Sequence, residues 1–230
     1  MGGKNLLFVP GLLCTHELYT NQIEGLKTKA AISVADHTGA DSMAAIAAQI
    51  LQKAPERFAL AGLSMGGYLS FEIMRQAPER VEKLALLDTK AGPDAPEISE
   101  RRKSLMAMAK EQGLDPVIDM LLPLLVHPDR VNDPQVAGVF ARMAHETGVD
   151  GFLNQMNAIL TRPDSTPGLA AISCPTLIIV GEQDALTPPA DATAMHEGIS
   201  GSHLAVIPDC GHLSTLERPA EVTRLLSQWL

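Results

Sequence analysis

Six short apolar runs are spaced along the 230 residues of the chain, and each ends in a turn or a polar cluster. Because these runs are apolar on both faces, they are typical of strands buried in a parallel sheet. Most are followed by a segment with helical spacing, as parallel crossover connections require. We therefore expect a doubly wound α/β fold, with a mostly parallel sheet of about six strands and helices on both faces. The predicted strands are Asn5–Val9, Ala31–Ala35, Phe58–Ala61, Lys83–Leu87, Thr176–Val180 and Leu204–Ile207.

Helical patterns connect these strands, except in one long interval. The connecting helices are predicted at Ser42–Lys53, Gly67–Gln76, Pro189–Glu197 and Pro219–Trp229. The fourth and fifth strands are about 85 residues apart, although a crossover needs only about a dozen. Helical spacing recurs inside this interval at Ile98–Gln112, Pro116–Val126, Pro134–Thr147 and Gly151–Leu160. We expect a single domain over residues 1–230, with a four-helix cap inserted at approximately 93–168.

Composition narrows the classes of partner. The net charge of −9 disfavours nucleic acid and anionic membranes, and the basic triplet Arg101-Arg102-Lys103 is interpreted as a solvated helix face. No run approaches the roughly 18 apolar residues of a membrane span. The three cysteines are too few for a disulfide framework or a zinc site, which favours a reducing compartment and a cytoplasmic location.

A candidate nucleophile lies between the third predicted strand and the helix that follows it. The segment Gly62-Leu-Ser64-Met-Gly66 has the pattern G-x-S-x-G in the strand-to-helix context that this motif requires. A serine on so sharp a turn needs neighbours without Cβ atoms. The turn exposes the Ser64 hydroxyl at the N-terminus of a helix, where developing negative charge is favoured.

A serine hydroxyl needs a base to accept its proton, and seven histidines compete for that role. His212 follows the last predicted strand, and open α/β sheets place their sites in loops at the carboxyl ends of strands. Asp184 follows the fifth strand and is predicted to orient His212, which gives the chain order serine, acid, base. Asp88, after the fourth strand, remains a rival acid. His37 could border the pocket, but is interpreted as a loop residue.

Charge that builds up on a carbonyl oxygen needs preorganised donors, usually two backbone N–H groups. Met65, the residue after the nucleophile, is predicted to supply one. The other is expected from the loop after the first strand, where Gly11 permits a turn towards Ser64. Leu12 is the predicted donor, with Leu13 as the alternative.

These motifs, in this order, resemble the α/β-hydrolase superfamily, in particular its compact bacterial esterase and lactonase branch. The resemblance rests on Pro10-Gly11-Leu12, Gly62 to Gly67, Cys174 to Asp184, Gly211-His212 and Glu217-Arg-Pro219. It implies a cap that closes over the pocket, an acyl-enzyme intermediate, and no requirement for a metal or an organic cofactor. Unlike relatives that begin with an antiparallel hairpin, this chain enters its first parallel strand almost at once. The bare sheet edge makes a homodimer possible.

The expected function is hydrolysis of carboxylic esters with small to medium acyl chains, because the cap is apolar and aromatic residues make up only 3% of the chain. The expected partner is a small-molecule ester. A lactonase, thioesterase or C–C bond hydrolase would use the same residues on a different pocket. A non-catalytic ligand-binding module on the same fold is the alternative from another class.

Overall fold

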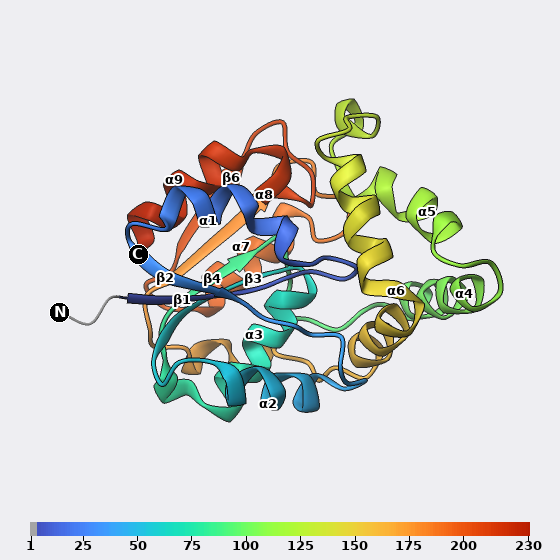
Figure 1. Ribbon diagram of the computed structural model, residues 1–230. Helices are drawn as coiled ribbons and strands as arrows, with labels where there is room; N and C mark the ends of the chain where they lie inside the picture. The colour runs from blue at the N-terminus through green and yellow to red at the C-terminus, as the bar shows by residue number, and fades with distance from the viewer. Residues whose placement is uncertain (1–3) are drawn as a thin grey trace.

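The computed structural model describes residues 4–230, and its centre is a six-stranded sheet in the order β2-β1-β3-β4-β5-β6. All five strand pairings are parallel, so the predicted α/β fold class is confirmed. Figure 1 shows the sheet edge-on, between two layers of helices. The strands are β1 (Lys4–Val9), β2 (Ala30–Val34), β3 (Phe58–Leu63), β4 (Val81–Leu87), β5 (Thr176–Gly181) and β6 (His203–Ile207).

The connecting helices cover both faces of the sheet. On one face α1 (Thr20–Leu26) packs against α9 (Pro219–Trp229). The other face is covered by α2 (Met43–Lys53), α3 (Met65–Gln76) and α7 (Pro189–Gly198). Because each central strand buries side chains on both faces, the sheet separates two apolar cores.

Helix α1 was absent from the sequence prediction. Its buried side chains are Gln22 and Leu26, so the apolar periodicity that reveals an amphipathic helix is interrupted by a polar residue. The Gln22 amide is satisfied on one side only: its Nε2 donates to the Thr215 carbonyl at 3.1 Å, whereas its buried Oε1 has no hydrogen-bond partner among the described residues.

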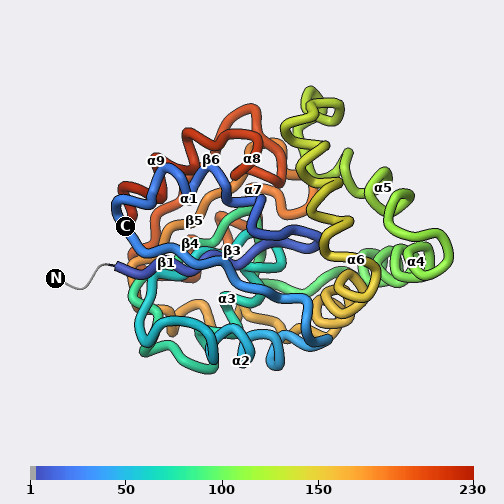
Figure 2. The backbone as a smooth tube through the Cα atoms, in the orientation of Figure 1, coloured from blue at the N-terminus to red at the C-terminus, as the bar shows by residue number. Residues whose placement is uncertain are grey.

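The interval between β4 and β5 forms α4 (Pro96–Gln112), α5 (Asp115–Leu125) and α6 (Ala137–Leu160). The two helices predicted at 134–147 and 151–160 are the halves of α6, which bends at Gly148, where φ is 71°. Figure 2 shows this green-to-yellow segment beyond the carboxyl ends of the strands, opposite the end where both chain termini lie. Within residues 4–230, no helix combines the length and the apolar character needed to cross a membrane.

Candidate active site

Ser64 lies on a strained turn between β3 and α3. Its φ of 56° and ψ of −115° are rare for a residue with a side chain. A Cβ at Gly62 would lie 2.2 Å from the Gly66 carbonyl oxygen, and one at Gly66 would lie 1.9 Å from the Val9 carbonyl oxygen. Both positions therefore exclude a side chain, for the reason that the G-x-S-x-G pattern suggested.

The turn is also held by hydrogen bonds. The Ser64 N–H donates to the Leu87 carbonyl at 2.9 Å, and the Thr89 hydroxyl donates to the Ser64 carbonyl at 2.8 Å. These contacts tie the turn to the end of β4, so the neighbouring strand helps to maintain the unfavourable backbone conformation.

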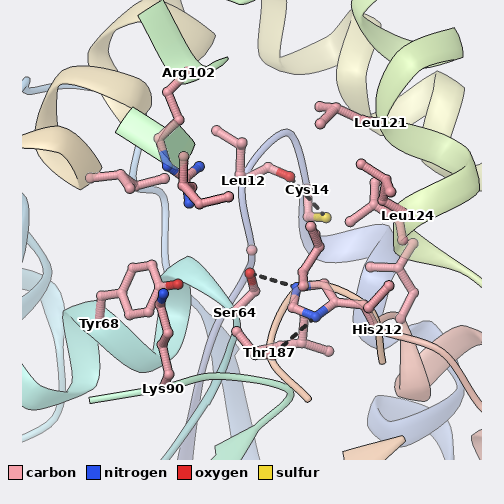
Figure 3. A pocket seen from close by; sticks show the side chains of 18 of the residues that line it. Leu12, Cys14, Ser64, Tyr68, Lys90, Arg102, Leu121, Leu124, Thr187 and His212 are labelled. Atoms are coloured by element: carbon pink, nitrogen blue, oxygen red, sulfur yellow. Dashed lines mark hydrogen bonds between the residues drawn. The ribbon is translucent and has the colours of Figure 1, made fainter. Parts of the chain in front are cut away.

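The structure brings Ser64, His212 and Asp184 together from three different strand ends. Ser64 Oγ lies 2.8 Å from His212 Nε2, and His212 Nδ1 lies 2.8 Å from Asp184 Oδ2. Figure 3 shows the imidazole between the serine and the loop that carries Thr187. Since both imidazole nitrogens have a partner, the ring is fixed in an orientation suited to accept a proton from Ser64.

Asp184 is held by its own loop. Its Oδ1 accepts from the backbone N–H groups of Leu186 and Thr187, both at 2.9 Å, and its Oδ2 accepts from the Thr187 hydroxyl at 2.8 Å. Thr187 Oγ1 also lies 3.2 Å from His212 Nδ1. Thr187 thus contacts both partners, a role that the sequence analysis missed because a threonine in a turn carries no motif.

Burial and charge act in opposite directions on this pair. Burial disfavours the charged imidazole, but the charge and hydrogen bond of Asp184, together with the negative charges of Asp88 and Glu217, outweigh it and raise the pKa of His212. Burial likewise disfavours the Asp184 carboxylate, but the charge and hydrogen bond of His212 hold its pKa below the usual value. The site therefore stabilises an imidazolium beside a carboxylate, the ion pair that forms when Ser64 loses its proton.

The rival acid, Asp88, lies in the same region but contacts different groups. Its Oδ1 accepts from the Gly181 N–H at 3.0 Å, and its Oδ2 lies 2.5 Å from the Ser214 hydroxyl. Burial, followed by the negative charge of Asp184, raises the pKa of Asp88 to about 8. Asp88 therefore links the loops that carry the acid and the histidine, while Asp184 makes the direct contact with His212.

The loop after β1 forms a turn in which the Cys14 N–H donates to the Gly11 carbonyl at 3.1 Å and Leu13 has a φ of 58°. The Leu13 N–H donates to Gln155 Oε1 of α6 at 3.0 Å, so it is already engaged. Within residues 4–230, neither Leu12 nor Met65 has an acceptor for its backbone N–H. Of the two backbone N–H groups considered as oxyanion donors in this loop, that of Leu12 is therefore the one without an acceptor.

Two further buried polar residues support these loops in roles that the sequence did not indicate. His37 lies in a loop, as predicted, and is buried against the turn after β1, with its Nε2 3.0 Å from the Gly11 carbonyl oxygen. Glu217 accepts from the N–H groups of Gly211 at 3.0 Å and His127 at 2.8 Å. The first fixes the turn beside Ser64, and the second fixes the loop that presents His212.

Ser64 and His212 open into a cavity of about 180 Å³ between the sheet and the helices α4 to α6. Leu121, Leu124, Leu125 and Phe140 form an apolar wall. A volume of this size suits a small or medium ligand, most of which would contact hydrocarbon.

On the opposite wall of the cavity, the interpretation of the basic triplet as a solvated helix face is wrong for Arg102. Arg102 does not belong to a solvated face: its side chain is only 18% exposed, lines the cavity, and pairs with Asp94 at 2.7 Å. Arg101 and Lys103 are exposed, as the prediction has it, although Arg101 also lines the mouth of the cavity. The ion pair of Arg102 could not be predicted from the sequence, because Asp94 lies in the preceding loop, at a spacing that is not typical of pairs on one helix.

No group of three or more His, Cys, Asp or Glu side chains with the arrangement of a metal site occurs in the described part of the chain. The polar groups of the site instead pair with one another, as described above for Ser64, His212 and Asp184.

Comparison with known protein families gives one matching model, described as the alpha/beta hydrolase family, over residues 7–225. Among solved structures, a thermophilic esterase from Thermogutta terrifontis superimposes with a TM-score of 0.90 at 32% identity, covering 99% of this chain and 89% of that one.

Two curated proteins are similar to the greater part of the chain. The chain is 29% identical to 3-oxoadipate enol-lactonase 2 of Acinetobacter baylyi over 159 residues, which are 69% of this chain and 58% of that protein. It is also 29% identical to a 2-hydroxy-6-oxononadienedioate/2-hydroxy-6-oxononatrienedioate hydrolase of Klebsiella pneumoniae, over 74% of this chain and 61% of the relative. The matches thus span about three fifths of the length of these two relatives.

Proposed function

The chain belongs to the α/β hydrolase family, and on that premise we propose that it is a serine hydrolase that cleaves carboxylic esters of small to medium acyl chain. The observation that carries the proposal is the hydrogen-bonded series from Ser64 Oγ through His212 to Asp184, with 2.8 Å at each step. A serine so placed beside a base is an activated nucleophile.

In the first half of the proposed reaction, His212 Nε2 takes the proton of Ser64 while Oγ attacks the ester carbonyl carbon. The electron pair of the carbonyl bond moves to oxygen, and the N–H groups of Met65 and Leu12 stabilise that oxyanion. When the intermediate collapses, the bond to the alcohol oxygen breaks and His212 gives its proton to the leaving alcohol. Ser64 is left as an acyl ester.

In the second half, water replaces the alcohol. His212 takes a proton from the water, whose oxygen attacks the acyl carbon, and the second oxyanion uses the same two donors. Collapse releases the carboxylic acid and returns the proton to Ser64 Oγ. Asp184 supports both halves because it stabilises the imidazolium in each.

Lactone hydrolysis is the second candidate, supported by the similarity to an enol-lactonase. A lactone is an ester within a ring, so the same attack opens it and leaves the alcohol attached to the acyl group. C–C bond hydrolysis is a further reaction to test, because the chain is similar to a 2-hydroxy-6-oxononadienedioate hydrolase. A non-catalytic binding module is disfavoured because such a module has no need of a strained serine in contact with a histidine.

The test is the hydrolysis of p-nitrophenyl esters from acetate to decanoate by the unaltered protein, by Ser64→Ala, and by Ser104→Ala. Ser104 is an exposed serine of α4 and serves as the matched control. We expect Ser64→Ala to lower kcat by about three orders of magnitude or more, and Ser104→Ala to leave it unchanged. Equal rates in the first two proteins, or no turnover of any ester or lactone by either, would refute the proposal.

A further inference from the structure

The cavity beside Ser64 has one wall that is rich in hydrogen-bond donors. Tyr68 of α3, Lys90 after β4, and Arg101 and Arg102 of α4 all line it. Figure 3 shows Lys90 and Arg102 extending towards the cavity from opposite sides, near Tyr68 and across from His212. This wall faces the leucine-rich wall, so a ligand in the cavity meets hydrocarbon on one side and cations on the other.

Asp94 is the sole carboxylate within ion-pair distance of these cations among residues 4–230, and it is shared. Its oxygens lie 3.0 Å from Lys90 Nζ, 2.7 Å from Arg102 Nε and 2.8 Å from Arg162 Nη2. The Asp94 side chain is only 4% exposed, so water contributes little to its surroundings. Asp94 is thus shared among three cations. The charges of Asp191 and Asp164 also act on Lys90 and Arg162, but from beyond ion-pair distance.

The donors of the cluster are also incompletely used. Among the residues that the structure describes, Arg102 Nη1 has only the Met156 sulfur at 3.9 Å as a partner, and a thioether is a weak acceptor. Arg101 has no carboxylate partner within the described residues. The Tyr68 hydroxyl likewise has no hydrogen-bond partner there, although the tyrosine is only 6% exposed. The guanidinium groups and the phenol therefore offer N–H and O–H groups to the cavity. The Lys90 ammonium, which already contacts Asp94 and the Pro93 carbonyl, adds positive charge beside them.

Resting on the function proposed above, we propose that this wall binds a carboxylate carried by the substrate, so that the preferred substrates are anionic esters or lactones. A carboxylate accepts two parallel N–H bonds from a guanidinium and is stabilised by a nearby ammonium. It would add a direct ion-pair partner for cations that otherwise share Asp94. The rest of such a substrate would lie against the leucine-rich wall, with its ester carbonyl at Ser64.

The experiment compares two esters that differ only at the distal carboxyl: the p-nitrophenyl monoester of a six-carbon dicarboxylic acid, and the same compound with that carboxyl capped as an uncharged methyl ester. We expect kcat/KM to be about tenfold or more higher for the free carboxylate. The preference should shrink as sodium chloride is added, because salt screens the partly exposed cations.

Variants test which residues carry the preference. Arg102→Gln and Lys90→Gln should each lower the ratio of the two kcat/KM values by about tenfold, and Arg101→Gln should lower it by a smaller factor because Arg101 is more exposed. Lys103→Gln is the control, since it removes the same charge from an exposed position of α4. Its ratio should equal that of the unaltered protein. If Arg102→Gln fails to fold because Asp94 loses a partner, Lys90→Gln and Arg101→Gln still test whether the wall binds the substrate carboxylate.

Equilibrium binding separates this inference from the proposed function. Calorimetry on Ser64→Ala should show about tenfold tighter binding of the free-carboxylate ester than of the capped one. A protein that hydrolyses neither ester but binds in that order would overturn the proposed function and support the subsite. A preference for the capped ester, or a ratio unchanged in all the cavity variants, would overturn the subsite even if Ser64 proves essential.

Discussion

The backbone N–H of Leu13 donates a hydrogen bond to Gln155 Oε1 at 3.0 Å, across 142 residues of the chain. It joins the turn after β1 to helix α6, and it holds Leu13 in a conformation with positive φ. Because Leu12 precedes Leu13 in this turn, Gln155 is a positioning residue for the proposed oxyanion donor.

We therefore expect Gln155→Ala to lower kcat by about tenfold to a hundredfold, with KM changed much less. Asn154 lies next to Gln155 on α6, and its Nδ2 donates to the Thr38 carbonyl in the loop after β2. Asn154→Ala removes that hydrogen bond and is the matched control. Steady-state kinetics on both variants provides the measurement. Equal kcat values for the two variants would show that Gln155 does no more than stabilise the fold.

Replacing either of the two buried aspartates, Asp184 or Asp88, by asparagine should affect activity to very different extents. Asp184→Asn should lower kcat by about three to four orders of magnitude, because an amide in contact with His212 Nδ1 no longer stabilises the imidazolium. Asp88→Asn should retain activity within about tenfold, since Asp88 contacts Gly181 and Ser214 instead of the histidine. A larger loss in Asp88→Asn than in Asp184→Asn would reverse the assignment of the acid.

The pH dependence of activity should follow His212. The proposed base acts only when its imidazole is neutral, and the Asp184 carboxylate raises its pKa above 6.5 against the effect of burial. As the pH falls through this raised pKa, kcat/KM should therefore fall, with a midpoint above 6.5. A pH–rate profile from about pH 5 to 9 would measure it. An acid limb centred below 6.5 would contradict the predicted shift.

Stability should depend on pH through Asp88. Burial raises its folded-state pKa from 3.8 to about 8, so between these values the folded protein keeps a proton that the unfolded chain releases. The Asp88 contribution to the free energy of unfolding is therefore largest below the lower pKa, decreases as the pH rises, and levels off above the higher one. In urea titrations, Asp88→Asn should show a flatter decline with pH than the unaltered protein. Parallel curves would exclude a protonated Asp88.

A methyl group at Gly66 should damage the fold as well as the site. Its Cβ would lie 1.9 Å from the Val9 carbonyl oxygen, which belongs to a central strand and has little freedom to move. We expect Gly66→Ala to lower the free energy of unfolding by about 3 kcal/mol or more. Gly168→Ala is the control, because no atom lies within 4 Å of the added group. Chemical denaturation of both variants makes the comparison.

The strand pattern and the order of motifs were sufficient to predict the sheet and the positions of Ser64, Asp184 and His212 near one another. Those features follow from local sequence: an apolar run predicts a buried strand, and parallel strands bring their carboxyl-end loops to one edge. Helix α1 was missed for an equally local reason, because its buried face includes Gln22.

The supporting residues could not be predicted in the same way. Gln155 meets Leu13, and Arg102 meets Asp94, only because helices α6 and α4 fold back over the strand ends. Helical spacing shows that such helices exist, but not how they are placed. The basic triplet illustrates the limit, since Arg102 and Lys103 are adjacent in sequence but one lines the cavity while the other faces solvent.

The backbone of Ser64 has a consequence for any effort to make this protein more heat-resistant. A φ of 56° costs a serine on the order of 1 to 3 kcal/mol, whereas glycine adopts such a conformation with little penalty. A screen that rewards only survival at high temperature would therefore favour glycine at position 64 and would enrich molecules without the proposed nucleophile. Selection for heat resistance should therefore be coupled to an assay of ester hydrolysis.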